Sequence, residues 1–495
     1  MIRELNQVTR VILLAFAGVV ISAAFWSIYQ GESLLKRDDN ARNVIAEQRI
    51  RRGAIYDRDG VRLAYSEETE SGVMRRVYPY PQVASAVGYY SLTYGTAGIE
   101  AAFDAALRGT DRVSDWEQWT NDVLHRVPQG SDVAGTIDLD VQLAASQALR
   151  GRRGAAVVIE IPSGRVLALV SQPGYNPNRL DEQWDALTED ETTSPLLNRA
   201  TSGVYQPGGA FQTVMLSALL AQHPDLTGGG ESVLNIEVPD AQTLVQVRQI
   251  SLGCLPETPD RTLTLAEAYL YGCPAAFMGA LEAGITPESL WDRWEILGLL
   301  DAPTLDGFET TAGDRPLEID TATDAVRLNA LLAGQGDLTI TPLQLAQVIA
   351  VIANQGNTVP LHIVEATRAP ESTIWQPVND TVMQPAVIRA DVAAALRLAM
   401  LQAAARSTCV QRALRGDQVL YGHCALAYGG PDQAPSPLAW FAGFVEMPSP
   451  SPEASAVLAV VVLEDEADPG AAADVAGAAF EAAALAPLSE PSNVQ

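Results

Sequence analysis

The sequence predicts an α+β fold in which an antiparallel sheet is flanked by helices. Two β-branched runs, 155–161 and 166–171, are joined by a Pro-Ser-Gly turn that is typical of a hairpin. Two further strand-like runs, 440–445 and 456–464, lie near the other end of the chain. Strands at both ends of a domain with helices between them indicate α+β layers rather than a doubly wound parallel sheet. The helices are expected at 141–149, 212–221, 263–283, 342–354 and 390–405.

The N-terminal stretch predicts a membrane anchor. Residues 11–31 carry no charge, and their length suffices for a helix that crosses a bilayer. Trp26 and Tyr29 stand where an interfacial aromatic belt would lie. We expect residues 1–10 to be a cytoplasmic tail and the large domain to lie outside the plasma membrane. Ser22-Ala23-Ala24 leaves a cleavable signal peptide as the alternative.

The rest of the chain divides by composition into three parts. Residues 32–135 mix short strand-like and helical pieces with many charges, which predicts a small extended module. The alternating strands and helices of residues 136–484 predict one large domain. Residues 485–495 are expected to be a disordered tail.

The charge balance excludes some classes of partner. Sixty acidic residues against 32 basic ones give a formal net charge of −28. Nucleic-acid binding needs a basic footprint, and an anionic membrane surface attracts basic segments, so neither is expected to bind the folded body. The four cysteines form no CxxC pair, so no zinc site is predicted, and no other metal or cofactor site is evident.

Several segments in order carry a family resemblance. RRGAIYDRDGVRLAYS (51–66) resembles an RGxIxDRxGxxLA signature, and PLLNRATSGVYQPGG (195–209) resembles the approach to a nucleophile. On these segments the chain resembles the class B penicillin-binding proteins, in particular their actinobacterial branch, over nearly its whole length. The other matching segments are 77–109, 135–149, 154–178 and 334–356.

The resemblance implies a specific architecture and activity. Residues 32–135 would be a non-catalytic pedestal or dimerisation module, and residues 136–484 a β-lactamase-like transpeptidase domain. The family activity is a serine-type D,D-transpeptidation that cross-links peptidoglycan stem peptides. The family also implies penicillin binding and a place in cell-wall biogenesis or cell division.

The first family motif pairs a serine nucleophile with a lysine three residues later on the same helix face. That spacing lets the amine activate the hydroxyl. Here the two positions hold Gly209 and Gln212, which offer neither a nucleophile nor a base. The nearest hydroxyls, Thr213 and Ser217, lie further along the helix, and Thr213 projects on a neighbouring face.

The other two motifs are replaced as well. The family S-x-N reads Gly272-Cys273-Pro274 here, so the relay hydroxyl and the substrate-binding amide are absent. The family K-T-G reads His423-Cys424-Ala425. His423 is expected to keep a partial positive charge, and Ala425 to crowd a substrate strand. Because strand side chains alternate, Cys424 should point away from a cleft that His423 faces.

The cysteines are expected to form structural disulfides. Outside the membrane thiols tend to be oxidised. Pairing Cys254 with Cys273 and Cys409 with Cys424 would close loops of about 20 and about 15 residues, each adding roughly 3 kcal/mol of stability. Pairing Cys273 with Cys424 across the cleft is one alternative, and a cysteine nucleophile is another.

Three functions follow from these replacements. The first is a non-catalytic scaffold or regulator that associates with other membrane proteins of cell-wall synthesis or division. The second is an active D,D-transpeptidase that uses displaced residues. The third is a receptor that binds peptidoglycan stem peptides in the emptied cleft. We expect the first, because residues that act as one catalytic unit leave little activity when they are lost together.

Overall fold

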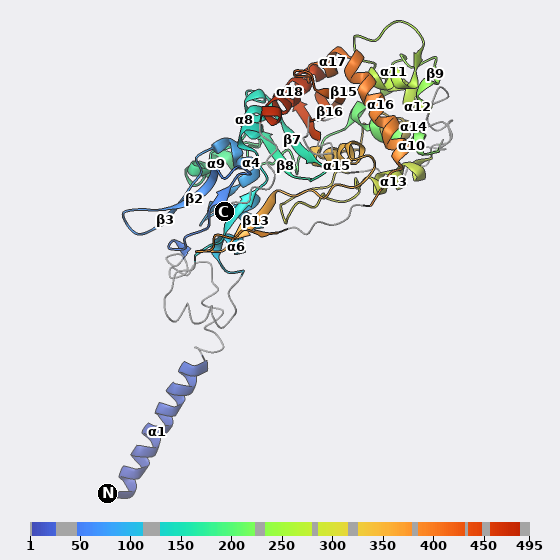
Figure 1. Ribbon diagram of the computed structural model, residues 1–495. Helices are drawn as coiled ribbons and strands as arrows, with labels where there is room; N and C mark the ends of the chain where they lie inside the picture. The colour runs from blue at the N-terminus through green and yellow to red at the C-terminus, as the bar shows by residue number, and fades with distance from the viewer. Residues whose placement is uncertain are drawn as a thin grey trace.

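The computed structural model describes most of the chain. The described residues are 2–25, 47–111, 129–222, 233–279, 286–314, 325–378, 385–430, 434–447 and 456–485. Helices cover both faces of a central sheet, and a second sheet lies beside it (Figure 1).

The central sheet is antiparallel throughout, which confirms the α+β prediction. Its order is β15-β16-β17-β7-β8, so the hairpin near the start of the domain pairs with the strands at its end, and β15 forms an edge. The strands span β7 (Arg153–Ile161), β8 (Val166–Gln172), β15 (Val419–Gly429), β16 (Ser436–Glu446) and β17 (Ala456–Glu464).

The two faces of this sheet bury two separate cores. Because side chains alternate along a strand, Val157 and Ile159 enter one core while Val158 enters the other. Helices α8 (Leu139–Ala148) and α18 (Pro469–Leu485) cover the Val158 face. The opposite face packs on α15 (Pro342–Ala353). A sheet buried on both sides explains why its strands read as continuous apolar runs.

Local capping fixes where the helices begin. Thr341 caps α15, its hydroxyl accepting from Gln344 N while the Gln344 side chain accepts from Thr341 N. Pro342 occupies the first helical position, where its missing N–H costs nothing. The helices α10 (Gln212–Gln222) and α16 (Ala390–Arg406) agree with the predicted 212–221 and 390–405 within one residue at each end.

The helix predicted over 263–283 is wrong. The described part of this stretch holds two short helices, α11 (Leu265–Leu270) and α12 (Ala275–Met278). Gly272 adopts a φ of +59° between them, a left-handed conformation that stops a right-handed helix. Pro274 then starts the next turn, since it lacks the N–H needed to continue the first.

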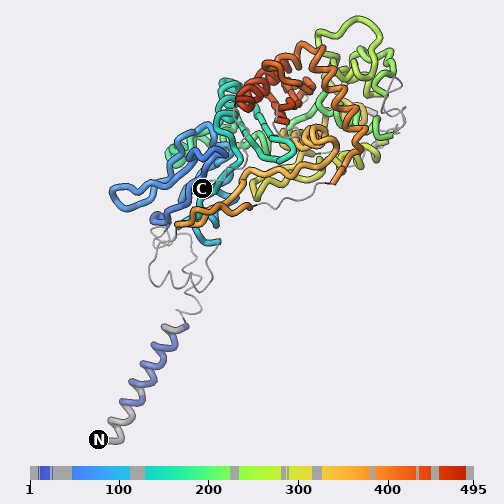
Figure 2. The backbone as a smooth tube through the Cα atoms, in the orientation of Figure 1, coloured from blue at the N-terminus to red at the C-terminus, as the bar shows by residue number. Residues whose placement is uncertain are grey.

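The second sheet joins two distant parts of the sequence. Its order is β14-β13-β6-β1-β2-β3, and β13 (Val364–Arg368) pairs antiparallel with β6 (Asp132–Gly135). Figure 2 shows this orange segment running back to the blue N-terminal strands. A piece of the large domain therefore completes the sheet of the N-terminal module. The other strands are β1 (Ile55–Tyr56), β2 (Arg62–Glu68), β3 (Met74–Val77) and β14 (Gln376–Pro377).

Short elements complete the described structure. In the N-terminal module they are η2 (Pro81–Val83), α4 (Ala84–Val87), β4 (Tyr89–Ser91), β5 (Gly95–Ala97), α5 (Gly98–Ala102) and α6 (Asp104–Arg108). In the large domain they are η3 (Pro177–Arg179), α9 (Leu180–Glu189), η4 (Gly208–Phe211), η6 (Val233–Asn235), β9 (Glu237–Val238), β10 (Val245–Val247), β11 (Ile250–Leu252), β12 (Leu263–Thr264), α13 (Pro287–Ile296), α14 (Ala325–Leu332) and α17 (Thr408–Gln411).

Helix α1 (Ile2–Phe25) covers part of the expected anchor, and residues 26–31 lie outside the described residues. Within the described ranges, no helix combines the length and the apolar character needed to cross a membrane. The predicted tail, 485–495, also lies outside them except for Leu485, which ends α18.

A buried ion network holds the N-terminal module together. Glu100 is fully buried, and its carboxylate accepts from Arg52 Nη2 at 2.9 Å and from Arg76 Nε at 2.6 Å. The Tyr78 hydroxyl donates to the same carboxylate at 3.2 Å. Three donors from separate segments thus converge on one acid, whose loss would leave two buried guanidinium groups short of a counter-charge.

We expect Glu100→Ala to lower the free energy of unfolding by about 3 kcal/mol or more, because removing one partner of a buried ion network is strongly destabilising. Denaturant unfolding of the full-length protein measures this. Glu67 makes an exposed ion pair with Arg75 and provides the matched control. Glu67→Ala should change stability by less than about 1 kcal/mol. Equal effects of the two substitutions would contradict the role given to Glu100.

Candidate functional site

The first motif lies at the junction of η4 and α10. Gly208 adopts a φ of +50°, and its N–H donates to the Gly334 carbonyl at 2.7 Å, which places the glycine-rich turn against the 334–336 loop. Gly209 follows in η4, and Gln212 begins α10. The helix geometry that would aim a lysine at a nucleophile is therefore retained, although neither side chain is present.

The edge strand β15 packs directly on this turn. His423 Nε2 donates to the Gly209 carbonyl, with 3.1 Å between the two atoms. A Cβ atom placed on Gly209 would lie 3.2 Å from the Ala425 Cβ, which is tighter than most contacts of this kind, and 3.8 Å from Gln212 Nε2. The methyl group of Ala425 therefore crowds the place where the family serine begins.

The segments of the second and third motifs each carry a disulfide. Cys254 is joined to Cys273 and Cys409 to Cys424, the pairs preferred in the sequence analysis. Cys424 bonds to Cys409 of α17, while its neighbour His423 contacts Gly209. No free cysteine is left to act as a nucleophile.

His423 is a neutral group in the core. It is 1% exposed, and its ring stacks on Tyr269 with 4.2 Å between centroids. Burial lowers its pKa to about 4, although the contact with the Gly209 carbonyl acts in the opposite direction. The expectation of a partial positive charge is therefore wrong, because burial disfavours the imidazolium form.

One cavity of about 520 Å³ unites most of the motif positions. The cavity is lined by Gly209, Gln212, Gly272, Pro274 and Ala425. The His423 side chain is buried and does not line the cavity. Gln212 is 3% exposed, and within the described part of the chain its Oε1 has no hydrogen-bond donor. The cleft is neither filled by side chains nor crossed by a disulfide.

The charges around this cavity are already paired. Arg412, which the sequence analysis did not single out, lines the wall, but its Nε donates to Asp474 at 3.0 Å and its Nη1 to Asp468 at 2.6 Å. Glu257 and Asp468 add negative charge to the lining. Among the described residues, no group of three or more acids, histidines and cysteines could hold a metal ion.

Tyr269 is the second residue that the sequence analysis missed. Besides stacking on His423, its hydroxyl lies 3.0 Å from Thr213 Oγ1 in a buried hydrogen bond. The sequence offered one indication of this residue, because Tyr269 is an aromatic residue one turn before Cys273 in an alanine-rich stretch. Its partners, however, come from α10 and β15. Only the fold brings these three elements together.

Comparisons with known proteins identify the family. Residues 52–133 match the penicillin binding protein A dimerisation domain, and residues 154–224 and 307–482 match the penicillin binding protein transpeptidase domain. The peptidoglycan D,D-transpeptidase PbpA of Mycolicibacterium smegmatis is 31% identical over 97% of this chain and 99% of the relative. The chain belongs to the class B penicillin-binding proteins.

Related proteins and structures support the assignment of this penicillin-binding protein. PbpA of Mycobacterium tuberculosis is 29% identical over 94% of both chains. The crystal structure of PBPA from M. tuberculosis matches with a TM-score of 0.74 and 28% identity, covering 88% of this chain and 99% of that one. Its imipenem acyl-enzyme complex matches with the same score, identity and coverage.

The buried His423 predicts a loss of stability in mild acid. The unfolded chain takes up a proton near pH 6.5, but the folded chain does so only near pH 4, so stability falls as the pH drops through this interval. At pH 5 the difference amounts to about 2 kcal/mol relative to pH 7.5.

We expect His423→Gln, whose amide can still donate to the Gly209 carbonyl, to remove this contribution. Denaturant unfolding at pH 7.5 and pH 5 measures this change in the free energy of unfolding. Both pH values lie above the sequence pI of about 4.4, where a protein without net charge tends to precipitate. The wild-type protein should lose about 2 kcal/mol more than the variant over this range. Parallel pH profiles would show that His423 is charged or solvated in the folded state.

Proposed function

We propose that this chain is a non-catalytic penicillin-binding protein that acts as a scaffold or regulator in cell-wall synthesis or division. The observation that carries the proposal is the contact between Gly209 and Ala425. The nucleophile position has no side chain, and the neighbouring methyl group stands 3.2 Å from where a side chain would start. The position therefore has no nucleophile, and a side chain placed there would have to displace the Ala425 methyl group slightly.

No displaced residue supplies the missing chemistry. Thr213 is buried in its bond to Tyr269, and Ser217 is buried in the same helix, so neither hydroxyl reaches a substrate in the cavity. Lys36 is the only lysine in this sequence, so no lysine within residues 136–484 can act as a base or bind a carboxylate. Acylation of a hydroxyl needs such an activating group.

The cleft also lacks a free positive charge for a substrate carboxylate. His423 is neutral above about pH 4, and Arg412 is held by two aspartates. An anionic ligand would instead meet the carboxylate of Glu257. These features argue against the active-transpeptidase alternative and against carboxylate binding in the manner of the family substrate.

A receptor role is the second candidate, and the cavity itself favours it. Its volume of about 520 Å³ falls in the range of ligand sites, and the unpartnered Gln212 Oε1 would accept a hydrogen bond from an amide or hydroxyl group. Saturable heat on titration with a stem peptide would support this candidate, and its loss in Gln212→Leu would place the peptide in this cavity.

We also propose that residues 11–31 anchor the chain in the plasma membrane and that the large domain lies outside it. The uncharged run supports the anchor, and two disulfides suit an oxidising compartment. The M. smegmatis and M. tuberculosis relatives are named peptidoglycan D,D-transpeptidases, which supports partners among the other membrane proteins of wall synthesis or division.

Incubation of the full-length protein with a fluorescent penicillin tests the proposal. We expect no covalent band on a denaturing gel, because no hydroxyl is placed and activated for acylation. The PBPA from M. tuberculosis, which forms a penicillin G acyl-enzyme complex, is the positive control. A band that excess ampicillin removes would overturn the proposal, and its absence from Thr213→Val or Ser217→Ala would identify the displaced nucleophile.

A further inference from the structure

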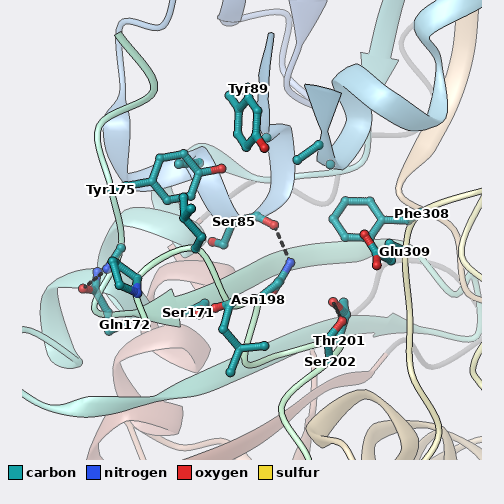
Figure 3. A pocket seen from close by; sticks show the side chains of 18 of the residues that line it. Ser85, Tyr89, Ser171, Gln172, Tyr175, Asn198, Thr201, Ser202, Phe308 and Glu309 are labelled. Carbon is teal, nitrogen blue, oxygen red and sulfur yellow. Dashed lines mark hydrogen bonds between the residues drawn. The ribbon is translucent and has the colours of Figure 1, made fainter. Parts of the chain in front are cut away.

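A second cavity lies between the N-terminal module and the transpeptidase domain. Its volume is about 290 Å³, and it shares no residue with the cavity at Gly209. Figure 3 shows Tyr89 and Tyr175 on one side of the hollow, with Phe308 and Glu309 across from them. Tyr89 belongs to the module, whereas Tyr175 and Glu309 belong to the large domain.

Some polar groups of this pocket are fully engaged in holding it together. Asn198 Nδ2 donates to the Ser85 carbonyl at 2.8 Å, and the Ser85 hydroxyl donates to the Leu169 carbonyl. The Ser171 hydroxyl donates to the Leu197 carbonyl and accepts from Arg199 N. These contacts tie the module to the domain and occupy the hydroxyl hydrogens of Ser85 and Ser171 and one of the two N–H groups of the Asn198 amide.

Three other polar groups in the pocket do not join the module to the domain through hydrogen bonds. Within the described ranges, no hydrogen bond or ion pair engages the hydroxyls of Tyr89 and Tyr175 or the carboxylate of Glu309. The two tyrosine rings meet edge to face at 5.8 Å. Burial raises the pKa of Tyr89, and the charge of Glu309 raises it further, so this carboxylate acts directly on the hydroxyl.

The chemistry of these groups selects the ligand. The lining includes one acid, Glu309, and no lysine, arginine or histidine, so the pocket favours a cation. Aromatic faces attract cations, and a carboxylate adds a charge-assisted hydrogen bond. Two tyrosine oxygens and one carboxylate provide three acceptors, which matches the three donors of a primary ammonium group.

We propose that this junction pocket is a binding site for a protonated primary amine at the end of a side-chain-sized group. Its volume lies at the lower end of the range for small-molecule sites, which suits one such group better than a larger ligand. A neutral sugar would leave the charge of Glu309 without a partner. The bound amine would contact both the module and the domain, and the site does not depend on whether the other cavity is catalytic.

Calorimetric titration of the full-length protein in a neutral detergent at pH 7 tests the proposal. The probe is Nα-acetyl-lysine N-methylamide, with the norleucine analogue as its uncharged counterpart and the trimethyl-lysine analogue as a cation without N–H donors. We expect saturable binding of the lysine probe, no detectable binding of the norleucine analogue, and weaker binding of the trimethyl analogue.

Two variants locate the site. Glu309→Gln keeps the shape but removes the charge, and we expect it to weaken binding about tenfold, as for a lost charge-assisted hydrogen bond. Glu295→Gln removes another exposed carboxylate, on α13, and should leave the affinity unchanged. Tyr89→Phe keeps the ring and removes one acceptor, so it should weaken binding less than Glu309→Gln.

The proposal is overturned if the lysine probe gives no saturable heat, or if the norleucine or trimethyl analogue binds as tightly as the lysine probe. Wild-type affinity in Glu309→Gln would overturn it as well. Saturable binding of N-acetylglucosamine, with no binding of the lysine probe, would replace the amine with a sugar. A thermal unfolding midpoint unchanged by Glu309→Gln shows that lost binding is not lost folding.

Discussion

The contact between the edge strand β15 and the turn at Gly208–Gly209 is the constraint on which the candidate site depends. The His423 imidazole donates to the Gly209 carbonyl, and the Ala425 methyl group occupies space beside Gly209. This contact between β15 and the turn is called the seam. In the family motifs, the position of Gly209 holds the serine and the position of Ala425 holds the glycine of K-T-G. Here a glycine faces an alanine, so the bulk has moved from the turn to the strand. The Ala425 methyl group thus packs against the turn from the side of the strand.

Ring stacking and disulfides hold the surroundings of this seam. The buried His423 is neutral and stacked on Tyr269, so the position of the family cation contributes packing in place of charge. Disulfides fix the segments around Gly272 and Cys424, which in a catalytic relative would provide a relay and a substrate strand. Stacking and covalent bonds therefore constrain the segments on both sides of the seam.

Outside the seam, several contacts hold the N-terminal module and join it to the large domain. The strand β13 leaves the large domain to finish the sheet of the N-terminal module, and the network around Glu100 holds that module together. Asn198 and Ser85 connect the two parts beside the junction pocket. Because these contacts fix how the two parts lie against each other, they also shape any surface that the two parts share.

The sequence by itself determined the family and the antiparallel sheet, because apolar periodicity and ordered motifs are local properties of the chain. The assignment of Gly209, Gln212 and the other motif positions also came from the sequence, and it stays a prediction. It missed the break at Gly272, where one backbone conformation overrides an alanine-rich helical pattern. Only the tertiary structure decided that His423 is uncharged, since its pKa depends on burial against Tyr269 of α11 and the turn at Gly209. The junction pocket was likewise beyond the sequence, because Tyr89, Tyr175 and Glu309 are far apart in the chain and meet only when the two parts pack together.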